Sequence, residues 1–344
     1  MNDSPWGAET QFFYDLTPDR ILDAFERSTG LRSTGRCLAL NSMENRVYEI
    51  EIETEEKLRH PWERFRILKF YRPGRWNENQ ILDEHRFLQQ LCDDEIPAVA
   101  PQPFLDGKTL HLDDSTGLWY TVFPKVGGRS PYELDEDQLK MCGRLLARLH
   151  SVGGVSDAEH RVHLTPDTYG RNSLSWLLEK QIIPIQFEKR YESVVTEICD
   201  RTQPLFEKFP QQRIHGDCHL GNLLWGDQGP FWVDFDDMVM GQCVQDLWLM
   251  IAGRDEHGLK QMSFLLEGYE QMRDFSRESL ALIEPLRALR FVHFNAWISK
   301  RWEDKSFQRA FPQYETMGFW QEQVSDLDEQ LRVIENNPWR PLMY

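Results

Sequence analysis

The sequence predicts an α+β protein of two lobes, a small strand-rich amino-terminal lobe and a larger helical carboxyl-terminal lobe. Short extended apolar runs separated by turn residues dominate the amino-terminal part of the chain. Apolar residues at helical spacing dominate the remainder. Between the two parts, residues 124–129 combine a proline with two glycines, a composition typical of a hinge. We therefore place the lobes at residues 1–125 and 126–344.

The composition limits the possible partners and location of the protein. Of its 344 residues, 40% are hydrophobic and 12% are aromatic, which is enough for a substantial core. A formal net charge of −17 argues against nucleic acid or an anionic membrane as a partner, because both repel an acidic surface. No apolar run approaches the ~18 residues of a membrane span, the six cysteines are scattered, and residues 1–5 lack the features of a signal peptide. We expect a cytoplasmic, monomeric protein with reduced thiols.

The first elements of the chain are a helix and a hairpin. A helix is predicted at 17–28, because Thr17 is a typical N-cap and Pro18 suits the first turn of a helix. Two extended runs within 38–50 flank a polar centre that contains Ser42. This order predicts a strand, a loop and a second strand.

A lysine interrupts the apolar strand predicted at 65–71. Strand alternation puts Lys69 on one face together with three large apolar side chains. A buried lysine needs a carboxylate partner, and the amphipathic helix predicted at 79–91 offers two. We prefer Glu84, with Asp83 as the close alternative. An edge lysine that keeps its charge in water is the other explanation of this pattern.

The most specific pattern of the chain begins His-Gly-Asp at residue 215 and continues to Asn222, with Asp234 twelve residues later. Two apolar runs separated by Gly, Asp and Pro lie between Asn222 and Asp234, and they predict a hairpin. If the hairpin folds about Gln228, Asn222 lies opposite Asp234 with Cβ atoms about 4.5–5.5 Å apart. An amide oxygen and a carboxylate at this separation can share a Mg²⁺ ion. Asp217 lies beside this pair, on the loop that leads into the hairpin.

The rest of the carboxyl-terminal lobe is predicted to be helical. After a last strand at 118–123, apolar residues recur at helical spacing in 136–150 and in later segments. Those later segments are 187–208, 243–253, 257–273 and 278–302. Asp246 begins an otherwise apolar helix, where N-capping accounts for a carboxylate in part.

The pattern H-G-D-x-x-x-x-N followed by Asp234 resembles the catalytic loop of the aminoglycoside-phosphotransferase and choline-kinase branch of the protein-kinase-like fold. The resemblance extends over nearly the entire chain and implies a bilobal kinase-like fold. It is carried by segments 41–48, 69–73, 80–91, 126–129, the catalytic loop, 233–237 and 283–287.

The resemblance implies roles for the residues of the catalytic loop. Asp217 is implied to orient the acceptor hydroxyl and to accept its proton. Asn222 and Asp234 are implied to hold Mg²⁺ on the phosphates, so that Asp217 and Asp234 are the expected catalytic residues. Asp246 is implied to bind the backbone of the catalytic loop.

The nucleotide site is implied by the same resemblance. Ser42 is implied to contact ATP, and backbone groups near 123–126 to read the adenine. Lys69 is implied to hold the α- and β-phosphates, with Glu84 as its ion-pair partner.

The sequence departs from the protein-kinase pattern at two positions. Asp236 replaces the glycine of the Asp-Phe-Gly motif, which argues against activation-loop switching. His219 replaces the catalytic-loop lysine, so contact with the γ-phosphate there is expected to be weaker or pH-dependent.

These features predict an ATP- and Mg²⁺-dependent phosphotransferase. Within the family, the chain is most similar to bacterial Ser/Thr protein kinases that act in stress responses and autophosphorylate. Two alternatives remain at this point. One is a kinase for a small-molecule hydroxyl on a sugar, amino alcohol or antibiotic, which would present its hydroxyl to Asp217 in the same way. The other is a nucleotide-binding regulatory protein without transfer activity.

Overall fold

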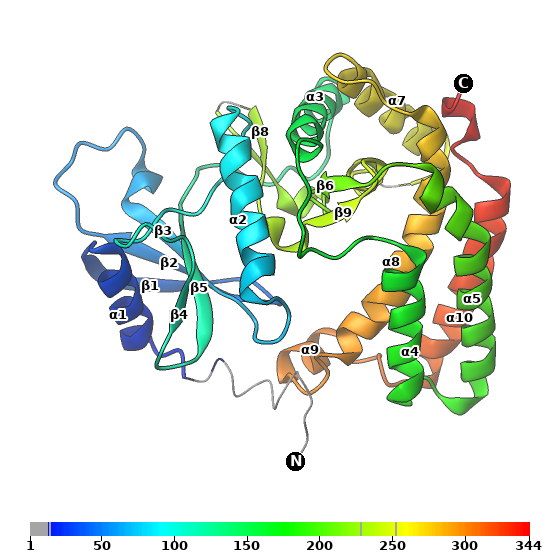
Figure 1. The fold of residues 1–344 in the computed structure, drawn as a ribbon, viewed down its shortest axis with the longest axis horizontal. Coiled ribbons are helices and arrows are strands. Elements are labelled where there is room, and N and C mark those ends of the chain that lie inside the picture. The colour runs from blue at the N-terminus through cyan, green and yellow to red at the C-terminus, as the bar shows by residue number, and fades with distance from the viewer. Residues whose placement is uncertain (1–12, 14, 228, 252) are drawn as a thin grey trace.

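The structure is a computed structural model that describes residues 13, 15–227, 229–251 and 253–344. A sheet with two flanking helices forms one part of the molecule, and helices with two short ribbons form the other (Figure 1). This α+β arrangement confirms the predicted fold class. Residues 1–12, which include the region where no signal peptide is expected, and Gln228, the predicted centre of the hairpin, lie outside the described residues.

The amino-terminal part is built on a five-stranded antiparallel sheet with the order β1-β2-β3-β5-β4. Its first two strands are the hairpin predicted around Ser42, and β3 is the strand predicted to contain Lys69. The strands are β1 (Ser33–Leu40), β2 (Arg46–Ile52), β3 (Phe65–Phe70), β4 (His111–Asp113) and β5 (Leu118–Pro124).

Two helices pack against this sheet and belong to different cores. Helix α1 (Pro18–Thr29) begins at the predicted N-cap Thr17, and its buried side chains join the core of the sheet. Helix α2 (Glu78–Asp93) lies between the sheet and the carboxyl-terminal helices in Figure 1, and the side chains of its later turns join the carboxyl-terminal core. Residues of α2 are therefore fixed at the boundary between the two parts.

The carboxyl-terminal part consists mainly of helices, drawn from green to red in Figure 1. Helices α3 and α7 cross closely, because a Cβ atom at Gly143 or at Gly268 would overlap the backbone of the opposite helix. The proposed lobe boundary at 125/126 falls in the connection between β5 and α3. The helices are α3 (Glu136–Gly153), α4 (Asn172–Glu179), α5 (Ile185–Lys208), α6 (Val244–Trp248), α7 (Glu256–Glu270), α8 (Ile283–Ser299), α9 (Lys305–Ala310) and α10 (Met317–Asn336).

Two short antiparallel ribbons lie next to the helices. One pairs β6 (Gln212–Ile214) with β9 (Val239–Gly241), and the catalytic loop begins directly after β6. The other is the hairpin predicted after the catalytic loop, formed by β7 (Leu223–Gly226) and β8 (Gly229–Trp232). The segments that follow β6 and β8 contribute side chains to the cleft described below.

The register of the β7–β8 hairpin differs by one residue from the prediction. Its terminal glycines pair with each other, which leaves a two-residue turn, the loop length most common in hairpins. The N–H of Val233 donates to the carbonyl oxygen of Asn222 at 3.0 Å. Val233 is therefore the residue opposite Asn222, and the prediction that Asp234 occupies this place is wrong.

Two further features bear on the expectations from composition. None of the described helices combines the length and the apolar character that crossing a bilayer requires. The six cysteines are free thiols.

Candidate active site

A cleft of about 810 Å³ lies between the two parts of the molecule. This volume is in the range of small-molecule and cofactor sites. The loop between β1 and β2, strand β3 and the hinge contribute one wall, and the catalytic loop, the segment after β8 and helix α8 contribute the other. The predicted site residues that line the cleft are Ser42, Lys69, Glu84, Asp217 and Asp234.

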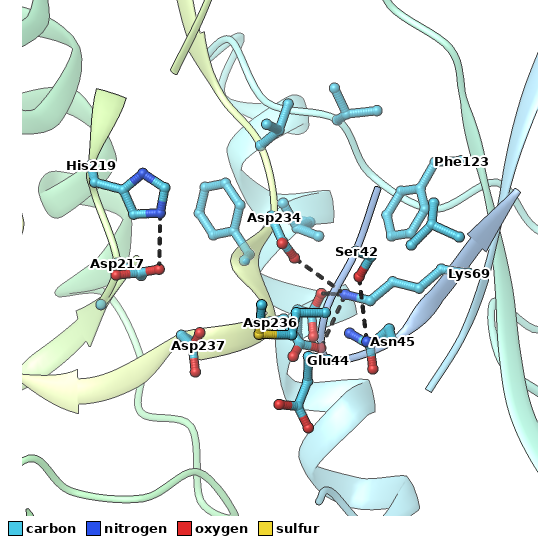
Figure 2. A pocket seen from close by; sticks show the side chains of 18 of the residues that line it. Ser42, Glu44, Asn45, Lys69, Phe123, Asp217, His219, Asp234, Asp236 and Asp237 are labelled. Atoms are coloured by element: carbon cyan, nitrogen blue, oxygen red, sulfur yellow. Dashed lines mark hydrogen bonds and ion pairs between the residues drawn. The ribbon is translucent and has the colours of Figure 1, made fainter. Parts of the chain in front are cut away.

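Lys69 is buried in the cleft wall among carboxylates. Its Nζ lies 3.0 Å from Asp236 Oδ1, 3.4 Å from Asp234 Oδ1 and 3.9 Å from Glu84 Oε1. Figure 2 shows the amino group directed toward the two aspartates. Burial would lower the pKa of Lys69, but the three carboxylates raise it well above the ordinary value. Lys69 is therefore a fixed cation, as a phosphate-binding lysine must be.

The structure brings Glu84, and not Asp83, to Lys69. Glu84 is 1% exposed and also binds Arg161 at 2.9 Å, while Asp83 points to His160. Burial raises the pKa of Glu84 to about 6, and the charges of Lys69 and Arg161 oppose that rise. The preferred partner from the sequence is thus the one that lies within ion-pair distance.

Asp236 makes the shortest ion pair with Lys69, although the sequence singled it out only as a departure from the kinase motif. Its second oxygen lies 2.6 Å from Arg75 Nη1. Arg75 also pairs with Asp237 and lies 3.5 Å from Glu44. Burial raises the pKa of Asp236, but Arg75 and Lys69 hold it well below the ordinary value. Arg75 therefore links the loop over the cleft to the segment that carries the aspartates.

The loop of residues 41–45 contains no glycine, and an ion pair between Glu44 and Arg301, which follows helix α8, fixes it in place. Glu44 accepts hydrogen bonds from Arg301 Nε at 2.7 Å, Arg301 Nη2 at 2.8 Å and Trp297 Nε1 at 2.9 Å. Ser42 Oγ accepts a hydrogen bond from the N–H of Asn45 at 3.3 Å, and both side chains face the cleft in Figure 2. The loop that would cover the phosphates is therefore anchored to the opposite lobe.

Replacing Glu44 with glutamine is expected to loosen this loop and to lower the stability of the protein. The bidentate contact with Arg301 becomes neutral, and removing one partner of a buried ion pair typically costs about 3–5 kcal/mol. We expect a higher KM for ATP and a lower midpoint of urea unfolding, measured by enzyme kinetics and circular dichroism. Glu55→Gln, at an exposed position on the same lobe, is the matched control. Unchanged KM and unchanged unfolding in the Glu44 variant would contradict the anchoring role.

The His-Gly part of the catalytic loop has a structural explanation. His215 Nδ1 accepts the N–H of Asp217 at 3.2 Å, and its Nε2 donates to the carbonyl oxygen of Val233 at 3.0 Å. The ring thus ties the catalytic loop to the residue before Asp234. Gly216 has a φ of +87°, and a Cβ atom there would overlap the carbonyl oxygen of Asp237. Both the conformation and the close approach require glycine.

Asp246 fixes the backbone of the same loop. Its carboxylate accepts the N–H groups of His215 and Gly216, each at 2.8 Å, and binds His150 Nε2 at 3.0 Å. Asp246 is fully buried. The implied contact between this aspartate and the backbone of the catalytic loop is therefore confirmed.

Asp217 faces the cleft next to an arginine and a histidine. Its Oδ1 lies 3.0 Å from Arg290 Nη2, and its Oδ2 lies 3.3 Å from His219 Nε2. Asn222 Nδ2 donates to the backbone carbonyl of Asp217 at 3.0 Å. Burial would raise the pKa of Asp217, but the hydrogen bond from His219 and the charge of Arg290 lower it to about 2. Asp217 is therefore ionised at neutral pH.

Asn222 and Asp234 supply oxygen donors that suit Mg²⁺. Asp234 adopts a left-handed backbone conformation with a φ of +60°, which ends the strand segment and directs its half-exposed carboxylate toward Lys69. Among the described residues, no three His, Cys, Asp or Glu side chains form a metal-binding group. Asp234 lines the cleft, whereas Asn222 is not among the lining residues and its Nδ2 binds the Asp217 backbone. The chemistry of the two side chains suits Mg²⁺, because this ion is usually held by one or two carboxylates plus substrate phosphates.

The sequence reasoning missed the arginines that organise the cleft, namely Arg75, Arg161, Arg290 and Arg301. Each pairs with a carboxylate far away in the chain, so that local charge patterns give no sign of the contact. One signal was available. The segment 234–237 carries three aspartates, and so many carboxylates next to a predicted metal site require cations from elsewhere.

The chain is similar to known kinases along nearly its whole length. The phosphotransferase enzyme family matches residues 38–283. Stress response kinase A of Escherichia coli strain K12 is 38% identical over 329 residues, which cover 95% of this chain and 96% of that protein. The serine/threonine protein kinase RdoA of Salmonella typhimurium is 36% identical over 346 residues, covering 98% of each.

Solved structures share the fold at low sequence identity. Amicoumacin kinase hAmiN, in complex with AMP-PNP, Ca²⁺ and Ami, has a TM-score of 0.69 at 20% identity and covers 90% of this chain and 96% of that one. A microcompartment-associated aminopropanol kinase has a TM-score of 0.59 at 19% identity, covering 89% and 95%. The chain belongs to the phosphotransferase enzyme family and is a kinase with the bilobal, protein-kinase-like fold that the sequence predicts.

Proposed function

We propose that this protein is an ATP- and Mg²⁺-dependent kinase that phosphorylates Ser and Thr hydroxyls of proteins, including its own. The geometry of the cleft carries the proposal, because Lys69 of one wall lies 3.4 Å from Asp234, which belongs with Asp217 to the other wall (Figure 2). The names of its full-length relatives support protein Ser/Thr as the acceptor and a bacterial stress response as the context. We further propose a cytoplasmic monomer, and the exclusion of nucleic acid and membrane partners stays a prediction from the net charge.

Each residue of the cleft has a task in phosphoryl transfer. Lys69 binds the α- and β-phosphates, because its charge is fixed by three carboxylates and it cannot be deprotonated near neutral pH. Ser42 and its loop cover the phosphates. When bound by Asn222 and Asp234, Mg²⁺ neutralises charge on the phosphate oxygens.

Asp217 orients the acceptor hydroxyl and takes its proton. A carboxylate with a pKa of about 2 is a weak base, so it accepts a hydrogen bond from the hydroxyl long before it accepts the proton. Orientation therefore contributes most early in the transfer, and the proton moves to Asp217 only when the new O–P bond is largely formed.

A small-molecule kinase is the alternative within the same reaction. The solved amicoumacin and aminopropanol kinases act on such acceptors, but at 20% identity or less they show only a common fold. A sugar or amino alcohol would place its hydroxyl at Asp217 just as a serine does. A nucleotide-binding regulator without activity is the other alternative, and the retention of Lys69, Asp217, Asn222 and Asp234 counts against it.

Incubation with γ-labelled ATP separates these possibilities. The purified protein is mixed with a generic protein substrate or with a panel of sugars, amino alcohols and aminoglycosides, in Mg²⁺ or in EDTA. We expect Mg²⁺-dependent label on Ser and Thr of the protein substrate and of the kinase itself. Label on a metabolite alone would establish the small-molecule kinase, and ATP binding without any transfer would establish the regulatory protein.

A further inference from the structure

Four Lys and Arg side chains line the described part of the cleft, namely Lys69, Arg75, Lys125 and Arg290. Three of them come from the amino-terminal part and are held by its carboxylates or by the segment after β8. Arg290 comes from helix α8 in the other lobe, and its ion pair is with Asp217. It is therefore the cation on the acceptor side of the cleft.

His219 stands where protein kinases have a lysine, but its ring is held by contacts within the catalytic loop. Its Nδ1 accepts the N–H of Gly221 at 3.0 Å, so the ring proton is on Nε2, which lies 3.3 Å from Asp217 Oδ2. Both nitrogens are thus engaged within the catalytic loop. The hydrogen bond with Asp217 raises the pKa of His219, but protonation of Nδ1 would break the bond with Gly221. Because both ring nitrogens are engaged within the catalytic loop, His219 has no free N–H group to offer the γ-phosphate, as a lysine would.

Arg290 is a permanent cation that lies next to Asp217. Its Nη2 is 3.0 Å from Asp217 Oδ1, and this oxygen is buried and accepts no hydrogen bond from any residue that the structure describes. An acceptor hydroxyl must come within about 2.6–3.2 Å of Asp217, and a hydroxyl that binds at Oδ1 takes the place of the guanidinium. The phosphorus atom then lies about 3–3.5 Å beyond the hydroxyl oxygen. The Arg290 side chain is 43% exposed, so it has room to move from Asp217 toward the phosphorus atom.

We propose that Arg290 is a further catalytic residue, whose guanidinium binds the oxygens of the phosphoryl group during its transfer. This inference rests on the proposed phosphotransferase function. In the step, the acceptor oxygen forms a bond to the γ-phosphorus, and the bond from this phosphorus to the β–γ bridging oxygen breaks. ADP leaves with that electron pair, and the acceptor proton passes to Asp217. Arg290 keeps its proton throughout, since a guanidinium is not deprotonated in proteins.

The chemistry of a guanidinium suits this role. Arginine presents five N–H donors in a planar fork that matches two phosphate oxygens at once, whereas lysine offers a point charge. The guanidinium of Arg290 is paired with the Asp217 carboxylate before the acceptor binds and with the phosphoryl oxygens during the transfer. It therefore has a negatively charged partner in both states. Binding of the acceptor hydroxyl at Asp217 thus favours the movement of the Arg290 guanidinium to the phosphoryl group.

The test compares Arg290→Ala and Arg290→Lys with wild type at saturating ATP and acceptor. Loss of one preorganised donor to the developing charge typically lowers kcat by about 10²–10³-fold. We expect that loss for Arg290→Ala with little change in the KM of the acceptor or in ATP affinity. Arg290→Lys should recover part of the rate, and added guanidinium ion should partly restore Arg290→Ala. Arg332→Ala, at an exposed arginine of α10, should match wild type.

Two results would overturn the inference. One is that Arg290→Ala has the kcat and the acceptor KM of wild type. The other is that it has a normal kcat with a raised acceptor KM, which would make Arg290 an acceptor-binding group. Circular dichroism and thermal unfolding check that the variants fold, and Arg290→Gln provides a second uncharged variant if alanine destabilises α8. Failure of the proposed function is distinguishable, because wild type itself would then transfer no phosphate to any acceptor.

Discussion

Replacing Asp217 with asparagine is expected to lower kcat by about 10²–10⁴-fold, the usual contribution of a positioned proton acceptor. An amide keeps the size of the side chain and can still meet the hydroxyl, but it cannot take its proton. The nucleotide site contains Lys69 and Asp234, and neither of them pairs with Asp217. ATP affinity, measured by calorimetry, should therefore change little. The loss should appear in kcat for protein and metabolite acceptors alike.

The control for this variant is Asp137→Asn, at an exposed aspartate in the first turn of α3. It removes the same charge far from the catalytic loop, so its kcat should equal that of wild type. A near-normal kcat for Asp217→Asn on every acceptor would show that Asp217 is not the proton acceptor. The phosphotransfer mechanism proposed here would then be wrong.

Most elements with a local sequence signal were predicted close to their observed bounds, although the helix expected across 243–253 ends at Trp248. Thr17 caps α1 because its hydroxyl accepts the N–H of Arg20, a contact within one turn. Strand β3 and helix α2 follow from alternation and amphipathic spacing, which depend only on neighbours in the chain. Helix α10 was missed although Thr316 caps it. Only three of its residues are buried, so its apolar stripe is too sparse to show a helical period.

The short ribbons and the hairpin register depend on geometry that the sequence leaves open. Strands β6 and β9 have three residues each, too few for an alternating pattern, and they are far apart in the chain. For β7 and β8, the sequence placed the turn correctly, but glycines at both Gly226 and Gly229 allow more than one centre. A shift of half a residue in that centre was enough to put Val233, instead of Asp234, opposite Asn222.

Lys69 and the residues of the catalytic-loop motif were predicted, whereas the arginines of the cleft and the role of Asp236 were missed. The catalytic-loop pattern led to Asp217, Asn222 and Asp234, because spacing within one motif carries the information. The pairs of Glu44 with Arg301 and of Asp236 with Lys69 join residues 257 and 167 positions apart. Such contacts result from the packing of the two lobes, which no local pattern records.

Replacing Lys69 with methionine is expected to raise the KM for ATP and to lower kcat by about 10²–10³-fold, the effect of losing one preorganised donor. Methionine keeps the volume and the apolar stem of the side chain, so that the packing of β3 is preserved. The charge that fixes the α- and β-phosphates is lost. Steady-state kinetics with varied ATP, together with calorimetric titration of ATP, measure the two effects separately.

The stability of this variant decides whether the kinetic loss can be interpreted. Removing one partner of a buried ion pair commonly costs about 3–5 kcal/mol, which could unfold a marginal protein. Here Arg161 still pairs with Glu84 at 2.9 Å and Arg75 with Asp236 at 2.6 Å, so the carboxylates keep a cation and the loss should be smaller. We therefore expect a folded protein with weak ATP binding. Lys108→Met, at a lysine whose side chain is 73% exposed, should bind ATP normally. Wild-type kinetics in Lys69→Met would remove Lys69 from the nucleotide site.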